Sequence, residues 1–245
     1  MPTDADFPIV ELRQYTLHPD QRDVLIELFD REFLETQEAT GMRVFGQFRD
    51  LDRPDRFVWF RGFPDMAARA AALHAFYTGP IWQAHRAAAN ATMIDSSNVL
   101  LLHRATATSG FAETAPRAQP GASATPASLF VATIYAIAPS ARAGFAGFFA
   151  DRIAPELTTA GATLVGSFAT EHSPNTFPRL PIREGEHVFV SLARFADAAA
   201  HQRTLATLAA TSSWRDHVAP ALADQLSAPP DVLRLTPTPR SRLPG

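Results

Sequence analysis

Polar residues alternate along three predicted strands, and this is the strongest chemical signal in the sequence. Residues 9–18 carry Glu11, Arg13 and Tyr15 at every second position, so these side chains share one face of a strand. The same face of the next two predicted strands, 42–50 and 56–63, carries Gln47, Arg49, Trp59 and Arg61. Guanidinium groups supply paired hydrogen-bond donors, so this face predicts a site for an anionic or enolate-like group.

The side-chain chemistry suggests a role for each residue. Arg13 would hold the anionic group, and Tyr15 would donate a hydrogen bond to one of its oxygens. Glu11 or His85 would carry a proton, which completes the predicted catalytic set. The residues predicted to bind the ligand are Arg49, Arg61, Gln47, Trp59, Phe57 and Tyr135. The aromatic members of this set would flank an apolar or aromatic ligand.

A tryptophan followed three residues later by a histidine occurs twice, as Trp82/His85 and Trp214/His217. The two residues lie one helical turn apart and share a face. Their presence in both halves of the chain favours packing for the tryptophan, with the histidine contacting a backbone carbonyl or a carboxylate. Catalysis is the alternative, and it remains open for His85.

The chain reads as a duplication. The segment QYTLHPDQR, residues 14–22, aligns with IYAIAPSAR, residues 134–142, at an offset of 120 that holds through Phe48 and Phe168. An insertion within residues 171–186 changes the offset to 132, which then holds through Leu101 and Leu233. A match this long predicts that one structural unit was built twice.

The predicted units are residues 7–104, called the first half, and 129–236, called the second half. Residues 105–128 are rich in small residues and proline and predict a linker, and 237–245 predicts a loose tail. Each half reads as β-α-β-β-α-β, the ferredoxin-like order, which makes the fold class α+β. Helices cover one face of such a sheet, so the two bare faces are expected to pack against each other around a shared interior.

The predicted strands have one apolar face, with Val10, Leu12, Val58 and Phe60, and we expect it to meet the helices. The polar face would then line the shared interior. The second half has lost these charges, because Val131, Thr133, Ser191 and Ala193 stand at the corresponding positions. Requirements of the fold apply to both halves, so charge kept in one half predicts a single site. Cross-strand ion pairs on an exposed sheet face are the alternative.

Composition excludes several mechanisms. All 22 basic residues are arginine and cysteine is absent, which excludes a Schiff-base lysine, a thiolate nucleophile and a cysteine-ligated zinc. The histidines lack metal-ligand spacing, so we expect neither a metal nor another cofactor. The net charge of −3 gives no reason to expect nucleic acid or a membrane as partner. The beginning of the sequence has no leader-like pattern, so the expected location is cytoplasmic. A homodimer is left open.

The first half resembles the NIPSNAP family. The resemblance rests on the opening E-L-R-x-Y-x-L-x-P at Glu11–Pro19, on residues 41–85, and on the closing NVLLL. It covers most of residues 9–103, and the second half departs from it where Val131 and Thr133 replace the glutamate and arginine. The resemblance implies the dimeric α/β-barrel architecture, here formed within one chain, and by itself specifies no reaction.

Two functions are compatible with these patterns. In the first, the barrel interior binds or transforms a small anionic or aromatic molecule, and an enzyme of this kind would be a cofactor-independent monooxygenase or isomerase. In the second, the chain is a non-catalytic scaffold that contacts partners through its outer helices and through Phe177, Leu180 and Ile182 of the insertion. A solvent-filled barrel would favour the first function, and a barrel packed with side chains the second.

Overall fold

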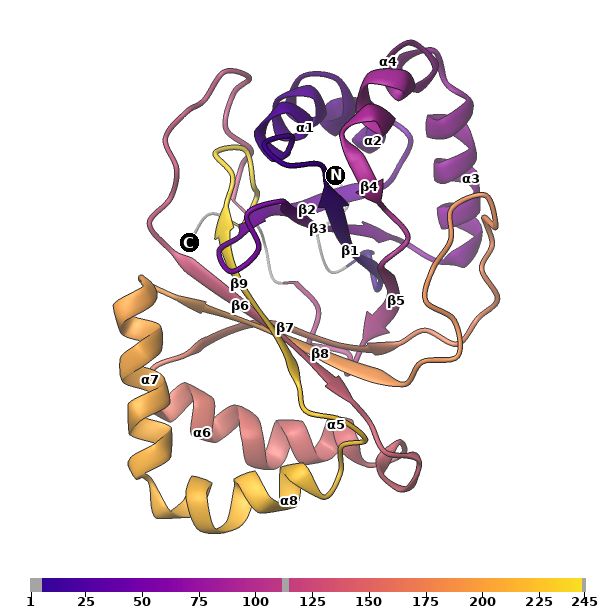
Figure 1. Cartoon of the computed structure of the whole chain (residues 1–245). Coiled ribbons are helices and arrows are strands. Elements are labelled where there is room, and N and C mark those ends of the chain that lie inside the picture. The colour runs from indigo at the N-terminus through magenta and orange to yellow at the C-terminus, as the bar shows by residue number, and fades with distance from the viewer. Residues whose placement is uncertain (1–5, 112–114, 244–245) are drawn as a thin grey trace.

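The computed structural model describes residues 6–111 and 115–243. Two layers of helices lie on opposite sides of a central barrel of strands (Figure 1). The first half contains β1 (Ile9–Leu17), α1 (Arg22–Leu28), α2 (Leu34–Glu38), β2 (Arg43–Asp50), β3 (Arg56–Phe63), α3 (Met66–Thr78), α4 (Pro80–Ala91), β4 (Met93–Asp95) and β5 (Val99–Arg104). The second half contains β6 (Leu129–Ala136), α5 (Phe145–Phe148), α6 (Ala154–Thr159), β7 (Thr163–Thr170), β8 (Val188–Phe195), α7 (Ala198–Ala210), α8 (Ala219–Ala223) and β9 (Asp231–Pro237).

Eight strands of the described residues close into one antiparallel barrel, which confirms the predicted fold class. The first half contributes strands in the order β5-β1-β3-β2, and the second half contributes them in the order β9-β6-β8-β7. The halves join edge to edge, because β2 pairs with β9 and β5 pairs with β7. Helices α1–α4 cover one side of the barrel and α5–α8 cover the other (Figure 1).

The barrel interior is packed with apolar side chains from both halves. Val10, Leu12 and Phe60 of the first half belong to one buried cluster with Leu192 and Leu233 of the second half. The prediction that the apolar face meets the helices is therefore wrong, and the two faces are exchanged. A barrel of about eight strands is just wide enough for side chains to fill it, so the apolar faces of both sheets meet in the middle. The polar face lies outside, under the helices.

The two halves share a local irregularity that shows how their strands correspond. Both β2 and β7 have a register shift at the same place, between Val44 and Gly46 and between Leu164 and Gly166. A Cβ atom at Gly46 would lie 2.6 Å from the ring of Phe48 inside the barrel. Glycine is therefore required where the strand bends over this ring.

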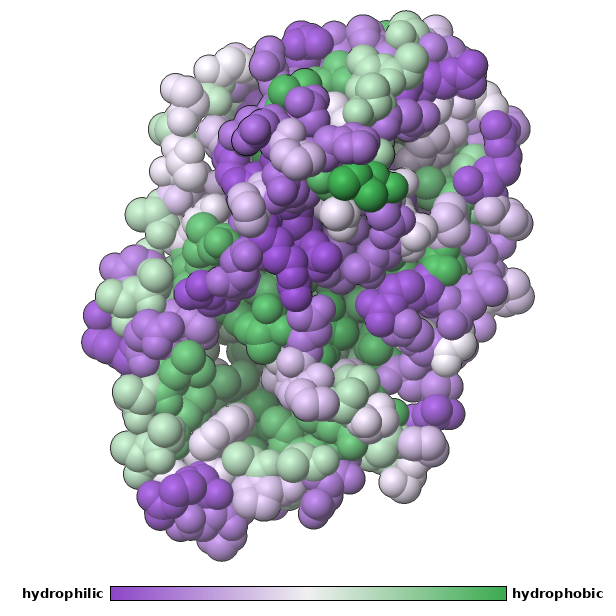
Figure 2. Space-filling model, viewed as in Figure 1, coloured by the Kyte–Doolittle hydropathy of each residue, from purple (hydrophilic) through white to green (hydrophobic). Residues whose placement is uncertain are grey.

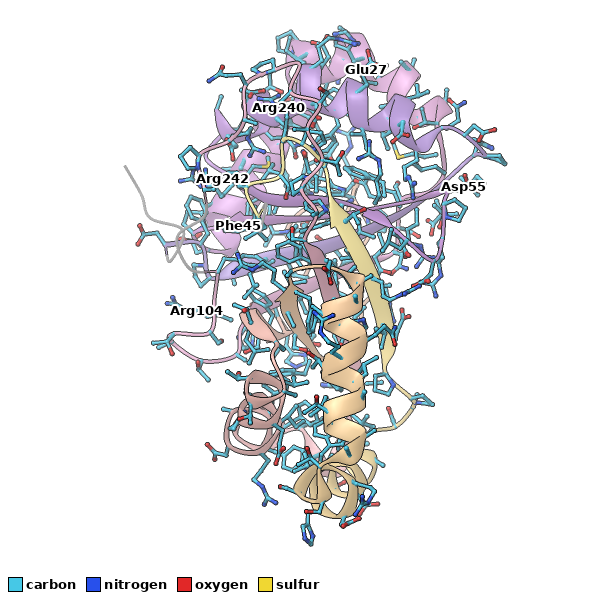
Figure 3. The ribbon with its side chains drawn as sticks, turned by 90° about the vertical axis from the view of Figure 1, so that its left-hand side faces the viewer. Glu27, Phe45, Asp55, Arg104, Arg240 and Arg242 are labelled. Atoms are coloured by element: carbon cyan, nitrogen blue, oxygen red, sulfur yellow. The ribbon has the colours of Figure 1, made fainter. Side chains whose placement is uncertain are left out.

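The connecting segment and the C-terminal segment pack against the barrel. Phe111 is buried among Phe45, Phe60 and other rings of the interior. The predicted loose tail is wrong, because Leu243 is 8 % exposed and joins the same cluster, and Arg242 N donates to Phe45 O. Figure 3 shows Arg240 and Arg242 on the half of the molecule that contains Phe45. In the described part of the chain, no helix has the length and apolar character needed to cross a bilayer.

Candidate functional site

A buried ionic cluster occupies the layer between the first-half strands and their helices. Glu11 accepts a hydrogen bond from Arg13 Nη1 at 2.7 Å and from Arg61 Nε at 2.8 Å, both at Oε2. Its other oxygen, Oε1, accepts from Arg69 Nε at 2.7 Å. All four residues are 0 % exposed. The structure therefore brings together three of the predicted residues, Glu11, Arg13 and Arg61, and adds Arg69.

The register of the strands and the start of α3 position this cluster. Glu11 lies opposite Arg61 across the β1–β3 pair, so both side chains point to the same face. Asp65 caps α3 by accepting a hydrogen bond from Ala68 N at 2.7 Å, and Arg69 follows one turn later. Sequence reasoning missed Arg69. Helical periodicity could have indicated this residue, because Arg69 lies on the buried side of α3 with Ala72, Leu73 and Phe76.

The cluster holds a surplus of two positive charges, because three guanidinium groups surround one carboxylate. Burial alone would raise the pKa of Glu11, but Arg61, Arg13 and Arg69 outweigh burial and hold this pKa well below its usual range. Glu11 is therefore a fixed anion that orients the arginines. The prediction that Glu11 carries a proton is wrong for this arrangement, since its oxygens already accept charge-assisted hydrogen bonds from three sides.

Several donors in this layer lack an acceptor. Arg13 Nη2, Arg69 Nη2 and Trp59 Nε1 are buried and have no hydrogen-bond partner among the described residues. The Trp59 ring offsets part of this deficit, because the guanidinium carbons of Arg13 and Arg61 lie 5.5 and 5.2 Å from its centroid. A buried donor without an acceptor costs about 1–3 kcal/mol, so the layer favours an additional acceptor or anion.

Tyr15 connects the cluster to a small aromatic cavity. Its hydroxyl accepts a hydrogen bond from Arg13 Nε at 2.9 Å, so the phenolic hydrogen remains available for donation. Burial raises the pKa of Tyr15 more than Arg13 lowers it, so the phenol stays neutral. Tyr15, Trp59, Tyr77 and neighbouring apolar residues enclose a cavity of about 30 Å³. This space is large enough for water and too small for an aromatic ring.

The insertion of the second half closes the site of the first half. Asn175 Oδ1 and Thr176 Oγ1 accept hydrogen bonds from Arg69 Nη1 at 3.0 and 3.1 Å. The Phe177 ring stacks on Tyr77, with centroids 5.8 Å apart and planes at 22°. Figure 1 shows this segment, between β7 and β8, lying beside α3 and β5. The apolar residues offered for partner contact in the scaffold hypothesis are thus engaged within the chain, which corrects that part of the hypothesis.

Of the remaining predicted site residues, some lie in this layer between strands and helices and others lie elsewhere in the molecule. Phe57 lies in the same layer, where its ring is 6.4 Å from that of Tyr15. Arg49 lies apart, near the surface, where Nε donates to Asp23 at 2.8 Å. Gln47 is buried, and its Oε1 accepts from Thr238 Oγ1 at 3.1 Å.

Tyr135 lies in the helical layer of the second half and packs with Phe145, Phe149 and Phe189. The interpretation that Tyr15 and Tyr135 face one cavity from two sides is therefore wrong. Burial raises the pKa of Tyr135, whose hydroxyl interacts with the hydroxyl groups of Ser191 and Thr133. The second half thus has a neutral network where the first half has an ionic one.

The structure gives the Trp82/His85 pair a packing role. Trp82 contacts the rings of Phe33, Phe76 and Tyr77 at centroid distances of 4.9–5.7 Å. His85 Nε2 lies 3.4 Å from Glu32 Oε2, so the histidine contacts a carboxylate as predicted. His85 lies outside the residues that line the cavity, although Trp82 is one of them. In the described parts of the chain, no three His, Asp or Glu side chains are grouped in a way that could hold a metal ion.

Comparison with known proteins finds a family model that matches part of the chain. The NIPSNAP family model matches residues 10–109, which confirms the resemblance. No curated protein matches the chain. An uncharacterized NIPSNAP-like domain protein from Burkholderia xenovorans is 27 % identical, and the match covers 38 % of this chain and 83 % of that one, with a TM-score of 0.35.

Two solved structures are similar over nearly the whole chain. An anthrone oxidase-like protein matches with 12 % identity over 97 % of this chain and 94 % of its own, with a TM-score of 0.60. A putative monooxygenase from Lactobacillus acidophilus NCFM matches with 13 % identity over 94 % of both chains, with a TM-score of 0.57. At these identities the similarity establishes the shared barrel fold alone.

Proposed function

We propose that this protein binds a small anionic aromatic molecule in the layer between the first-half strands and helices. The surplus of two buried positive charges around Glu11 carries the proposal. Isolated charges are costly in a dry interior, and an anion beside Arg13 and Tyr15 would relieve this cost. The barrel interior is packed with side chains, the outcome that we expected to favour a scaffold, and it leaves no room for a ligand there. We place the site instead on the outer face of the same strands, because the buried surplus charge lies on that face.

The ligand needs more space than the closed structure provides. The cavity measures about 30 Å³, whereas an engineered cavity of about 150 Å³ accommodates benzene. Its wall includes Tyr77, which is held by Phe177 of the insertion. Binding would therefore require this wall to open, and the insertion is the segment that covers it.

The chemistry that suits this layer acts on a deprotonated phenol or enol. Two surplus positive charges lower the pKa of a bound phenol or enol, and Tyr15 can donate a hydrogen bond to the resulting oxyanion. We therefore propose an enzyme that needs no cofactor, either a monooxygenase or an isomerase. In the first case molecular oxygen is the oxidant: one oxygen atom enters the substrate as a carbonyl, and the other leaves as water with two substrate hydrogens. In the second case a proton moves between two carbons.

The similar structures described as a putative monooxygenase and an anthrone oxidase-like protein support the oxygenase alternative. They share the fold, so the support is an analogy. The cytoplasmic location, the homodimer and the domain boundaries remain predictions.

Tryptophan fluorescence provides the test, because Trp59 and Trp82 line the cavity. We expect anthrone and 1-naphthol to change this fluorescence with saturation, and Arg13→Gln to weaken the binding of both at least tenfold. Arg49→Gln is the matched control, since Arg49 pairs with Asp23 away from the cluster. An oxygen electrode then reports whether anthrone is consumed with oxygen. Equal binding by the Arg13→Gln variant, with its fold intact by circular dichroism, would refute the proposal.

A further inference from the structure

The second half has a cleft of about 240 Å³ that is separate from the site described above. It lies where α5 meets β7 and β8, with the end of β5 beside it. Phe145 and Phe189 form part of its apolar floor. Its polar lining consists of Arg142, His103, His172, His187 and Thr170. Figure 2 shows that hydrophobic surface gathers over the helices of this half.

Small residues line this cleft at two positions where the first half has larger ones. Ala169 of β7 corresponds in the strand register to Arg49 of β2, and Ala146 of α5 corresponds to Ile26 of α1. In the first half Arg49 and Ile26 stand at these positions and line a different surface cleft, with Asp23, Asp30 and Arg240 beside them. In the second half both alanines line open space.

The polar groups around this space are mostly cationic or able to become cationic. The rings of His172 and His187 lie 4.7 Å apart. Arg142, His172 and His187 all line the cleft, and desolvation together with the positive charges of Arg142 and His172 lowers the pKa of His187. His103 Nδ1 lies 2.8 Å from Arg104 O, so Nδ1 carries the hydrogen and Nε2 remains for another partner.

A neighbouring carboxylate, Glu171, lies close to two of these histidines, since His103 and His172 lower its pKa. Its Oε1 accepts a hydrogen bond from Ser173 N at 2.8 Å, which holds it toward the insertion. Glu171 is absent from the cleft lining, whereas Arg142 and the three histidines belong to it. The cleft thus combines an apolar floor with a basic rim, the combination expected for an amphipathic anion.

We propose that this cleft is a second binding site, which takes a small organic acid with a single aromatic ring. Arg142 would pair with the carboxylate, and His172 or His187 would donate a hydrogen bond to it. The ring would contact Phe145 and Phe189 in offset or edge-to-face geometry. The volume of about 240 Å³ exceeds the roughly 150 Å³ that accommodates benzene, which leaves room for a carboxylate. This inference does not depend on the function proposed for the first half.

Isothermal titration with benzoate tests the site, with benzyl alcohol as the uncharged comparison. We expect saturable binding of benzoate that depends on Arg142, and binding of benzyl alcohol to the same cleft at least tenfold weaker. Arg142→Gln should weaken benzoate binding at least tenfold. Arg152→Gln, at an exposed arginine of the same half, should leave it unchanged.

A second variant tests the apolar floor. Ala146→Phe places a ring in the cleft while keeping every basic group, so it should abolish benzoate binding. In the Arg13→Gln variant, whose first-half site is weakened, the benzoate binding that depends on Arg142 should persist, which separates this site from the one in the first half. Undiminished binding by both Arg142→Gln and Ala146→Phe, or loss of binding with Arg13→Gln, would overturn the proposal. Thermal unfolding of each variant verifies that the chain is folded.

Discussion

Replacing Glu11 with glutamine tests whether the ionic cluster is as buried as the structure shows. The carboxylate is the shared partner of Arg13, Arg61 and Arg69, and all four side chains are 0 % exposed. Glutamine has nearly the same shape, so packing is kept while three guanidinium groups lose their counter-charge. Removing one partner of a buried ion pair costs about 3–5 kcal/mol, and we expect a loss in this range for Glu11→Gln.

Urea unfolding followed by circular dichroism measures this loss. The matched control is Asp23→Asn, which breaks the exposed pair with Arg49 and should cost about 1 kcal/mol or less. A difference below about 1 kcal/mol between the wild-type protein and Glu11→Gln would refute the reasoning. It would mean that water or mobile ions already reach these arginines.

The pH dependence gives an independent check of the same argument. The pKa of Glu11 is depressed in the folded protein from its ordinary value of 4.5. A depressed carboxyl pKa stabilises the fold above the unfolded value, and this contribution is lost as the pH falls toward the folded value. We therefore expect the difference in free energy of unfolding between wild type and Glu11→Gln to be largest at pH 7. At pH 3 this difference should be smaller by about 2 kcal/mol. A gap that does not change with pH would contradict the assigned charge state.

Two further predictions concern packing. Gly46→Ala should lower the free energy of unfolding in urea by about 1–3 kcal/mol, because the new Cβ would lie 2.6 Å from a buried phenylalanine ring. The control is Gly147→Ala, whose Cβ would have no neighbour within 4 Å, and it should be neutral or slightly stabilising. Phe177→Ala should accelerate limited proteolysis within residues 171–186, because the insertion loses its stacking on Tyr77. Unchanged cleavage would show that other contacts hold this segment.

The fold could be predicted from the sequence because the two halves of the chain align with each other. The alignment of the two halves, the ferredoxin-like order and the bare sheet faces led to the closed barrel that the structure contains. Periodicity also separated the two faces of each strand correctly, since Glu11, Arg13, Trp59 and Arg61 do share a face. Periodicity does not show which face of a strand turns toward the barrel interior and which turns toward the helices.

The wrong assignment of faces has a physical explanation. A polar face looks suited to an interior that holds a ligand, and an apolar face looks suited to helices. An eight-stranded barrel has room only for side chains, so apolar residues of both halves fill it, as Leu12 and Leu192 do. The helices can accept the polar face because Arg69 of α3 completes the hydrogen bonds of Glu11. This partner comes from a distant segment, which strand patterns alone cannot reveal.

The differences between the two halves remain informative after the two sheet faces are exchanged. Residues required by the barrel recur in each half, as Gly46 and Gly166 do, and both approach a phenylalanine ring of their own strand. Residues that differ open a distinct space in each half. The first half buries charge beside an aromatic cavity that the insertion of the second half covers. The second half has Ala169 where the first half has Arg49, and Ala169 lines a cleft with an apolar floor. The two proposed sites therefore differ in chemistry although both halves contribute strands to one barrel.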